Sequence, residues 1–379
     1  MISKAEVIVV GSGPSGLMAA EVLATSGHKV RIIEHKKSPA RKFLLAGRGG
    51  LNLTHSEPLA KFLRRYGDAQ NFLAPMINAF PPDAVVKWCQ GLGQETFVGS
   101  SGRIFPKAMK SSPLLRAWLR RLDGLGVELL TGQLWEGFGG KPTILALGGA
   151  SWPETGSDGG WVETFTNAGI KVTSLQASNG RILFPWTEHL IARFAGQPVK
   201  NLILHYANAA AQGEITITIE GLEGGGIYQL HRVMREQPGL PLVIDLKPAL
   251  THGEVTKRLS QPRGSMSQSN FLRKVLALTP AALGLLHETK LPISAESIKA
   301  LTLYPNGFAG ISRAISTAGG VALAELDGNC QLKSQPLTYC VGEMLDFDAP
   351  TGGYLLQAAF STAVAAAKDL VQNLAMVEP

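Results

Sequence analysis

The most informative part of this chain is Ala5–Glu34, AEVIVVGSGPSGLMAAEVLATSGHKVRIIE. Its β-branched and aliphatic run, Val7–Val10, predicts a buried strand. Three glycines follow at G-x-G-x-x-G spacing, and they are Gly11, Gly13 and Gly16. An amphipathic helix is expected next, and its N-terminus offers free N–H groups and a positive dipole end to phosphates. The stretch therefore predicts the βαβ unit of an adenine dinucleotide site.

Each part of this unit fits one part of such a ligand. Gly11 permits the tight turn, Gly13 lets the backbone approach a pyrophosphate, and Gly16 lets the helix pack closely on the strand. The second predicted strand, Lys29–Ile33, leads to Glu34, 18 residues past the last glycine, where an acid suits a ribose hydroxyl. The alternative is a glycine-rich turn in an ordinary βαβ unit.

The other end of the chain indicates which dinucleotide is bound. Leu337–Gln357, LTYCVGEMLDFDAPTGGYLLQ, contains a short strand, then Gly342 and Glu343, then a glycine pair that opens a helix of small residues. This stretch resembles the second FAD fingerprint of glutathione-reductase-like flavoproteins. The resemblance implies that the acid binds the ribityl chain and that the helix points at flavin N1 and the C2 carbonyl. A helix N-terminus there stabilises the negative charge of the reduced ring.

A third segment, Thr143–Ala150, reads TILALGGA, as the same superfamily does where its sheet returns to the dinucleotide. Three fingerprints in this order favour FAD over NAD, although each glycine pair alone also fits a plain strand-to-helix turn. The predicted FAD-binding residues are Gly11, Gly13, Pro14, Ser15, Gly16, Glu34, His35, Lys42, Arg48, Gly49, Gly50, Asn52, Thr54, Ala146, Gly148, Gly149, Gly342, Glu343, Gly352, Gly353 and Tyr354.

Further motifs indicate one particular family of flavoproteins. They are RKFLLAGRGGLNLTH at Arg41–His55, SSGRIFP at Ser100–Pro106 and ISTAGGV at Ile315–Val321. With these motifs the chain resembles the flavoprotein family that includes aminoacetone-oxidase-like and bile-acid-reductase-like oxidoreductases. Some relatives are implicated in reducing uracil to dihydrouracil in ribosomal RNA. Many relatives carry an arginine near Ala318 and an asparagine near Leu355, so the resemblance implies a divergent branch and leaves the substrate open.

Composition favours a cytoplasmic enzyme. The chain has 379 residues, and no apolar run approaches the roughly 20 residues of a membrane span. Its three cysteines are far apart, which argues against a disulfide framework and a thiol relay. No histidine cluster predicts a metal site.

The net charge of +7 leaves basic clusters in two predicted helices. Spacings of three and four residues place each cluster along one helical face. The charge favours contact with RNA phosphates or another polyanion, and the alternative is a solvated helix face. The two clusters are Lys61, Arg64 and Arg65, and Arg116, Arg120 and Arg121.

The positions of the fingerprints predict a discontinuous α/β fold. A Rossmann-like FAD-binding domain of glutathione-reductase type is expected at 1–180 and 305–379. The intervening texture is β-like, as in ITITIE at Ile215–Glu220, and predicts a β-rich substrate domain at 181–250 and about 291–304. Residues 251–290 predict a small helical cap, with a loop at Gln261–Asn270.

Catalytic residues are harder to assign. Residues 48–54 are expected to form a loop that bonds the flavin edge, and otherwise form a structural turn. Arg103 could hold an anionic or carbonyl group of the substrate, and otherwise forms a surface salt bridge. Tyr228 and His231 could donate protons, and otherwise are core residues. No second G-x-G-x-x-G unit is present, so NAD(P)H would visit the flavin transiently as electron donor.

Three functions remain open. The first is an NAD(P)H-fed reductase that transfers hydride from flavin N5 to an activated C=C bond of RNA uracil or a small enone. The second is an amine oxidase that uses oxygen. The third is a flavin-bearing RNA-binding or assembly factor without turnover.

Overall fold

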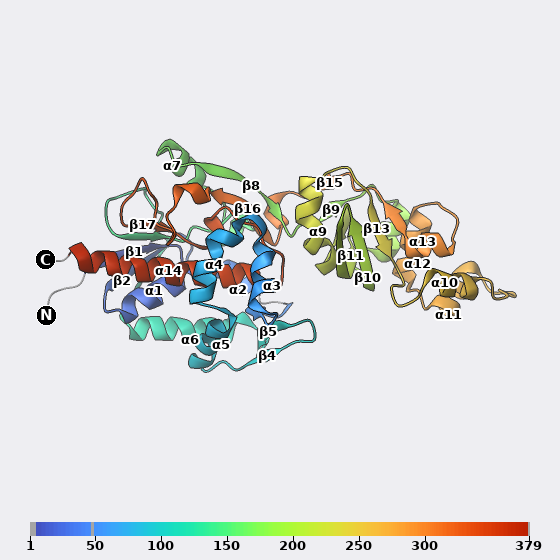
Figure 1. Ribbon diagram of the computed structural model, residues 1–379, viewed down its shortest axis with the longest axis horizontal. Coiled ribbons are helices and arrows are strands. Elements are labelled where there is room, and N and C mark those ends of the chain that lie inside the picture. Colours follow the sequence, from blue (N-terminus) through green and yellow to red (C-terminus); the bar gives the residue numbers. More distant parts are fainter. Residues whose placement is uncertain (1–4, 47–48, 378–379) are drawn as a thin grey trace. The chain divides into compact units, whose positions relative to one another are not determined.

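The computed structural model describes residues 5–46 and 49–377, and it contains two compact units. Unit 1 lies within Met1–Gln176 and Ser316–Pro379, and unit 2 is Ala177–Ile315. The chain therefore leaves the first unit, builds the second and returns (Figure 1). Strands β8 (Val172–Ser178) and β16 (Ser316–Val321), which lie where the chain passes between the units, pair as a two-stranded sheet.

Unit 1 is built on a five-stranded parallel sheet of Rossmann type. Its strand order is β17-β7-β1-β2-β6, and every pair in it is parallel. This arrangement confirms the predicted fold class and the predicted strands of the N-terminal βαβ unit. The strands are β1 (Glu6–Val10), β2 (Lys29–Glu34), β6 (Glu128–Thr131), β7 (Thr143–Leu145) and β17 (Thr338–Cys340).

Two helices from opposite ends of the chain pack together in the unit 1 core. They are α1 (Pro14–Thr25) and α14 (Tyr354–Val377), which contact each other extensively (Figure 1). Small and aliphatic residues such as Ala20, Ala363 and Ala367 are fully buried there, which allows close helix approach. The other unit 1 helices are α2 (Arg41–Ala46), α3 (Leu59–Leu63), α4 (Gln70–Ala79), α5 (Pro82–Gly91), α6 (Ser111–Gly124) and α7 (Trp161–Asn167).

A small antiparallel sheet completes unit 1. Its order is β3-β5-β4, and it consists of β3 (Thr54–His55), β5 (Arg103–Pro106) and β4 (Thr96–Val98). Register places Thr54 opposite Ile104 and His55 opposite Arg103. Two of the motifs that define the family resemblance therefore meet in one sheet.

Unit 2 carries a separate seven-stranded antiparallel sheet of order β14-β13-β10-β11-β12-β9-β15. Its strands are β9 (Ile182–Leu183), β10 (Pro198–Tyr206), β11 (Ala209–Ile217), β12 (Gly221–Glu223), β13 (Leu242–Asp245), β14 (Leu301–Leu303) and β15 (Gly307–Phe308). Its helices are α8 (Glu188–Phe194), α9 (Gly225–Glu236), α10 (His252–Leu259), α11 (Gln268–Leu276), α12 (Pro280–Glu288) and α13 (Ala295–Lys299).

The structure differs from the sequence prediction in local boundaries. Unit 2 extends past residue 305, because β15 pairs with β9 and so belongs to its sheet. The helices expected as a cap share one hydrophobic core with the sheet, as Val255 and Leu272 show. Helix α11 begins inside the loop predicted at Gln261–Asn270, because the Ser267 side chain caps its first turn. The role of unit 2 in substrate binding stays a prediction.

Within residues 5–46 and 49–377, no helix combines the length and the apolar character needed to cross a membrane.

Candidate functional site

Loops at the carboxyl ends of the parallel strands of unit 1 come together at one edge of the sheet. The Gly11 N–H donates to Ile33 O at 2.8 Å, and the Ala146 N–H donates to Val10 O at the same distance. The Val341 N–H donates to Leu145 O at 2.9 Å. These bonds link the loops after β1, β7 and β17 to neighbouring strands. Ligands of open α/β sheets bind at such an edge.

The three motif glycines have different structural roles. Gly11 has φ +94°, and a Cβ there would lie 2.3 Å from Ala146 O. A Cβ at Gly16 would lie 1.9 Å from Gly11 O, so this glycine is needed for helix α1 to pack on the turn. At Gly13, in contrast, no described heavy atom lies within 4 Å of a Cβ. The turn is therefore packed at its ends and open in the middle.

The open position lies in front of the N-terminus of α1. Pro14 occupies the first turn of the helix, and Gly13 is the N-cap residue, so no side chain of the described residues caps the helix. The N–H groups of Ser15 and Gly16 can therefore donate hydrogen bonds to a phosphate. A Cβ at Gly342 would come 2.0 Å from Ser15 Oγ, which brings the loop after β17 against the same helix end.

The Glu34 carboxylate ties the end of β2 to the glycine turn. It accepts hydrogen bonds from the Ser12 N–H at 3.0 Å, from Ser12 Oγ at 2.5 Å and from the Lys36 N–H at 2.7 Å. An acid in this place suits a ribose hydroxyl, as the sequence predicts. His35 follows it and is half-buried.

An ion pair joins the N-terminal and C-terminal motifs. Lys42 Nζ donates to both carboxylate oxygens of Glu343, at 2.9 and 2.7 Å, and to Ser151 Oγ at 2.5 Å. The Thr317 N–H donates to Glu343 Oε1 at 3.1 Å. The side chains of Lys42 and Glu343 are 24% and 21% exposed, so water screens this pair less than a surface pair.

Gly149, in the loop after β7, allows β16 to approach this ion pair. A Cβ at Gly149 would lie 2.3 Å from Thr317 Oγ1, which accepts a hydrogen bond from the Ala150 N–H at 2.9 Å. A Cβ at Gly148 would lie 2.8 Å from Ser157 Oγ. The structure thus assembles the predicted residues of three separate segments around Glu343.

The segment expected to bond the flavin edge is only partly a loop. Arg48 lies outside the described residues. Gly49 has open space around a Cβ, and Gly50 has φ +108° and faces the Met109 side chain. Asn52 Oδ1 is buried without a hydrogen-bond partner among the described residues, so it can accept a bond from a ligand.

Thr54 lies in strand β3, and its side chain is already engaged. Its Oγ1 donates to Gln357 Oε1 at 2.8 Å, and the residue is fully buried. A Cβ at Gly353 would lie 2.5 Å from Thr54 Cα, so the glycine lets β3 contact the start of α14. Thr54 therefore positions this helix rather than presenting a free hydroxyl.

A cluster not found from the sequence surrounds Tyr354. The Tyr354 hydroxyl donates to Glu57 Oε1 at 2.5 Å, and Arg65 donates from Nε and Nη2 to the two Glu57 oxygens at 3.1 and 3.0 Å. Lys61 Nζ lies 3.6 Å from the same carboxylate. Only the Glu57–Lys61 spacing of four residues could have indicated part of this cluster.

Charge and burial set the protonation of the cluster. Burial raises the pKa of Glu57, but hydrogen bonds from Arg65 and Tyr354 outweigh it and hold this pKa at about 2. Burial and the bond to Glu57 raise the pKa of Tyr354. Glu57 is therefore a carboxylate at neutral pH, and Tyr354 is a neutral phenol.

His55 and Arg103 lie beside this cluster. His55 Nδ1 accepts a bond from the Glu57 N–H at 3.0 Å, so Nε2 carries the ring proton and donates to Ser101 O at 2.9 Å. Burial lowers the pKa of His55, which favours the neutral ring. The Arg103 Nε lies 3.8 Å from a Cβ built at Gly352. Arg103 therefore borders the glycine pair that precedes α14.

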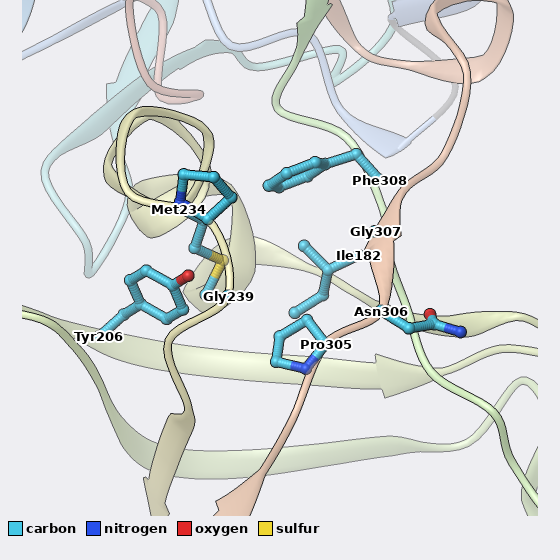
Figure 2. Close-up of a pocket in the computed structure, with 9 residues that line it drawn as sticks. Ile182, Tyr206, Met234, Gly239, Pro305, Asn306, Gly307 and Phe308 are labelled. Atoms are coloured by element: carbon cyan, nitrogen blue, oxygen red, sulfur yellow. The ribbon is translucent and has the colours of Figure 1, made fainter.

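The other two predicted catalytic residues belong to unit 2, in helix α9. Tyr228 is half-buried, and burial raises its pKa to about 12. His231 is 1% exposed, and its ring packs edge-on against the Phe308 ring with centroids 5.2 Å apart. Phe308 in turn lines a pocket of about 200 Å³, which Figure 2 shows with Ile182 and Met234 around it. His231 is absent from the pocket lining, and proton donation by either residue stays a prediction.

The basic clusters are partly neutralised. Lys61 and Arg65 form ion pairs with Glu57, and Arg121 pairs with Glu21 at 2.8 Å. The first cluster does not lie on one α-helix as predicted, because α3 ends at Leu63 and a 3₁₀ helix follows. Arg64 is exposed, as are Arg116 and Arg120 on α6. RNA contact through these arginines stays a prediction.

Comparison with known proteins identifies relatives over nearly the whole chain. The family model described as "HI0933-like protein Rossmann domain" matches residues 5–143 and 136–369. A "Ribosomal RNA dihydrouridine synthase" of Escherichia coli (strain K12) is 25% identical over 97% of this chain and 98% of its own length. A "3-dehydro-bile acid delta(4,6)-reductase" of Clostridium scindens is 24% identical over 96% of this chain and 98% of its own.

Solved structures share the fold at low identity. A 3-ketosteroid delta1-dehydrogenase from Sterolibacterium denitrificans has a TM-score of 0.53 and 11% identity, covering 97% of this chain and 99% of its own. A flavocytochrome c3 fumarate reductase in an open conformation has a TM-score of 0.51 and 14% identity, covering 98% and 79%. These likenesses support the fold of the chain.

Proposed function

Because the chain belongs to the HI0933-like family of Rossmann-domain proteins, we propose that it uses FAD to transfer a hydride from NAD(P)H to an activated carbon–carbon double bond. It is an FAD-dependent oxidoreductase, and the acceptor is a uracil ring of RNA or a small enone. The names of two relatives support this choice, because both denote saturation of carbon–carbon double bonds, one in a uracil ring and one in a bile acid.

The observation that carries the proposal is the open space at Gly13 in front of the uncapped N-terminus of α1. A pyrophosphate would be held there by backbone N–H groups. The Glu34 carboxylate, at the end of β2, would bind a ribose hydroxyl. The buried and unsatisfied Asn52 Oδ1 would accept a bond from the ring edge. These residues fit FAD. When bound, FAD would supply two-electron chemistry at its ring.

The chain's own residues would orient this group. Lys42 neutralises Glu343 and holds it against the Thr317 N–H, so the acid predicted to bind the ribityl chain has a fixed position. Such preorganisation is what a protein contributes to a cofactor's chemistry. Arg103, beside Gly352, would hold a carbonyl or anionic group of the acceptor.

After hydride transfer, the neighbouring carbon still needs one proton, and this proton has a separate source. The Tyr354 hydroxyl donates a hydrogen bond to Glu57, and the neutral His55 ring donates one to a backbone carbonyl, so both of these hydrogens are already engaged. A water molecule, or Tyr228 or His231 of unit 2, would protonate the neighbouring carbon. Replacing Tyr228 by Phe and His231 by Gln, one at a time, tests these two residues against water.

An anaerobic visible spectrum tests the proposal directly. The purified protein should be yellow, and NADPH or NADH should bleach the flavin band, after which a small enone or a uracil-containing ribosomal RNA fragment should restore it. A yellow protein that neither nucleotide bleaches would contradict the reductase. Rapid oxygen uptake with an amine would select the oxidase instead, and tight RNA binding without turnover would select the binding factor. A protein unable to bind FAD would contradict all three.

A further inference from the structure

The start of α14 is held by contacts from a part of the chain remote in sequence. Tyr354, its first residue, follows Gly352 and Gly353, which have φ values of +129° and +93°. The Tyr66 hydroxyl donates to the Tyr354 carbonyl at 2.7 Å. The Tyr354 hydroxyl donates to Glu57. Both the backbone and the side chain of this residue are therefore fixed.

The Tyr354 ring is enclosed as well. His55 stacks on it with ring centroids 5.6 Å apart and an interplanar angle of 19°. The centroid of the Phe62 ring lies 4.7 Å from the centroid of the Tyr354 ring, and the Arg65 guanidinium carbon lies 5.8 Å from the same centroid. A Cβ at Gly352 would lie 2.9 Å from the Tyr354 ring, so the ring also contacts the glycine turn. The ring therefore has neighbours on several sides, including the glycine turn.

Glu57 is the group on which these contacts converge. Its side chain is only 6% exposed, yet it carries a charge, because Arg65 binds both of its oxygens. A buried charge costs free energy unless it is paired and hydrogen-bonded. Here the charge is satisfied by an arginine that Glu57 holds over the tyrosine ring and by the tyrosine itself.

We propose that Glu57 is a positioning residue for the cofactor site: through Tyr354 it fixes the Gly352–Gly353 turn and the N-terminus of α14. This proposal rests on the proposed function, because the turn is the predicted contact of the flavin ring. The N-terminal dipole of α14 acts over the first turn only, so its effect on the flavin depends on the position of that turn. Glu57 acts through Tyr354 and makes no contact of its own with the flavin ring.

The test uses Tyr354→Phe, Glu57→Ala and the double variant in the full chain. Tyr354→Phe removes the hydroxyl without changing charge or ring size. We expect faster amide exchange in residues 352–357 of the FAD-free protein. We also expect FAD binding to weaken about tenfold, as for one lost hydrogen bond to a charged group, and the flavin reduction potential to fall. Glu57→Ala should do the same, and the double variant should add little.

The direction in which the flavin reduction potential shifts distinguishes a positioning role of Glu57 from a direct effect of its charge. Loss of a negative charge alone stabilises the reduced, anionic flavin, so a purely electrostatic Glu57 would raise the potential. Displacement of the N-terminus of α14 removes a stabilising dipole from the reduced, anionic flavin, so it lowers the reduction potential. Tyr354→Phe, which has no charge change, decides the matter even if Glu57→Ala does not fold. If Tyr354→Phe leaves the exchange, the FAD affinity and the potential unchanged, the proposal is wrong.

Glu95→Ala is the matched control. Glu95 also pairs with a cation, Lys107, but both side chains are exposed, at 72% and 64%, and the two residues flank strands β4 and β5. This variant should behave as the parent protein. A parent protein that binds no FAD would overturn the proposed function, whereas the exchange measurement would still test whether Glu57 holds the turn.

Discussion

Lys42 and Glu343 lie 301 residues apart in the sequence, yet the lysine ammonium contacts both oxygens of the carboxylate, at 2.9 and 2.7 Å. This single ion pair joins the segment after β2 to the loop after β17. The discontinuous unit is therefore closed by a charged contact as well as by its hydrophobic core.

Removing one partner of this pair should cost more than removing both. Lys42→Met leaves the Glu343 carboxylate partly buried, with the Thr317 N–H as its remaining hydrogen-bond donor among the described residues. In a double-mutant cycle with Glu343→Gln, we expect a coupling energy of about 0.5–3 kcal/mol in the free energy of unfolding, measured by denaturant titration. The exposed Lys141–Glu6 pair is the control and should give at most about 1 kcal/mol. Additive effects at Lys42 and Glu343 would contradict the assignment.

Gly13→Trp should block the cofactor without unfolding the protein. A side chain at Gly13 enters open space, so the apoprotein should keep its melting temperature while FAD binding weakens by at least about tenfold. Glu34→Arg should likewise give a colourless protein, because it removes the predicted ribose acid. Flavin absorbance after purification measures both. Retention of stoichiometric FAD in both variants would refute the site.

Gly16→Ala should instead destabilise the fold itself. Its Cβ would lie 1.9 Å from Gly11 O, and a backbone atom cannot move aside cheaply. We expect a loss of about 1–3 kcal/mol in the free energy of unfolding of the apoprotein. Gly13→Ala serves as the control, since no described atom is near that Cβ. Equal stabilities would show that Gly16 is not a packing glycine.

Stability in acid should depend on Glu57. Its pKa is about 2 in the folded protein and 4.5 ordinarily, so the folded state binds the proton more weakly. The stabilisation from Glu57 is therefore fully present above pH 4.5 and is lost as the pH falls towards 2. Melting temperatures at pH 6 and pH 3 should differ less in Glu57→Gln than in the parent. An identical drop in both proteins would be inconsistent with this pKa.

RNA binding, if RNA is the acceptor, should depend on the exposed arginines of α6. Arg116 and Arg120 lie one helical turn apart, whereas Arg121 is bound to Glu21. Replacing both exposed arginines by glutamine should reduce the slope of log affinity against log salt by roughly 1.5, the value for two lost phosphate contacts. Filter binding at several salt concentrations measures the slope. Lys107→Gln with Lys141→Gln, which removes two exposed cations elsewhere, should leave it unchanged.

The Rossmann unit and the class of the fold could be predicted from the amino-acid sequence alone. Val7–Val10, the three glycines and Glu34 lie within one short stretch, and strand, turn and helix signals act over a few residues. The discontinuous order also followed, because the C-terminal fingerprint needs a place in the same sheet as the N-terminal one. Structure confirmed both, with β17 and β7 parallel beside β1.

The contacts of the polar side chains at the site depend on how distant segments pack in the folded protein. Thr54 was predicted at the ligand but bonds Gln357, 303 residues away, and Tyr354 bonds Glu57, 297 residues away. The Glu57–Lys61 spacing was the one local signal at Glu57, because its partner Tyr354 comes from the other end of the chain. Periodicity and spacing report contacts within one element, whereas packing of separate elements fixes which donor meets which acceptor. That packing made Lys42 and Glu343 a pair and left Gly13 open.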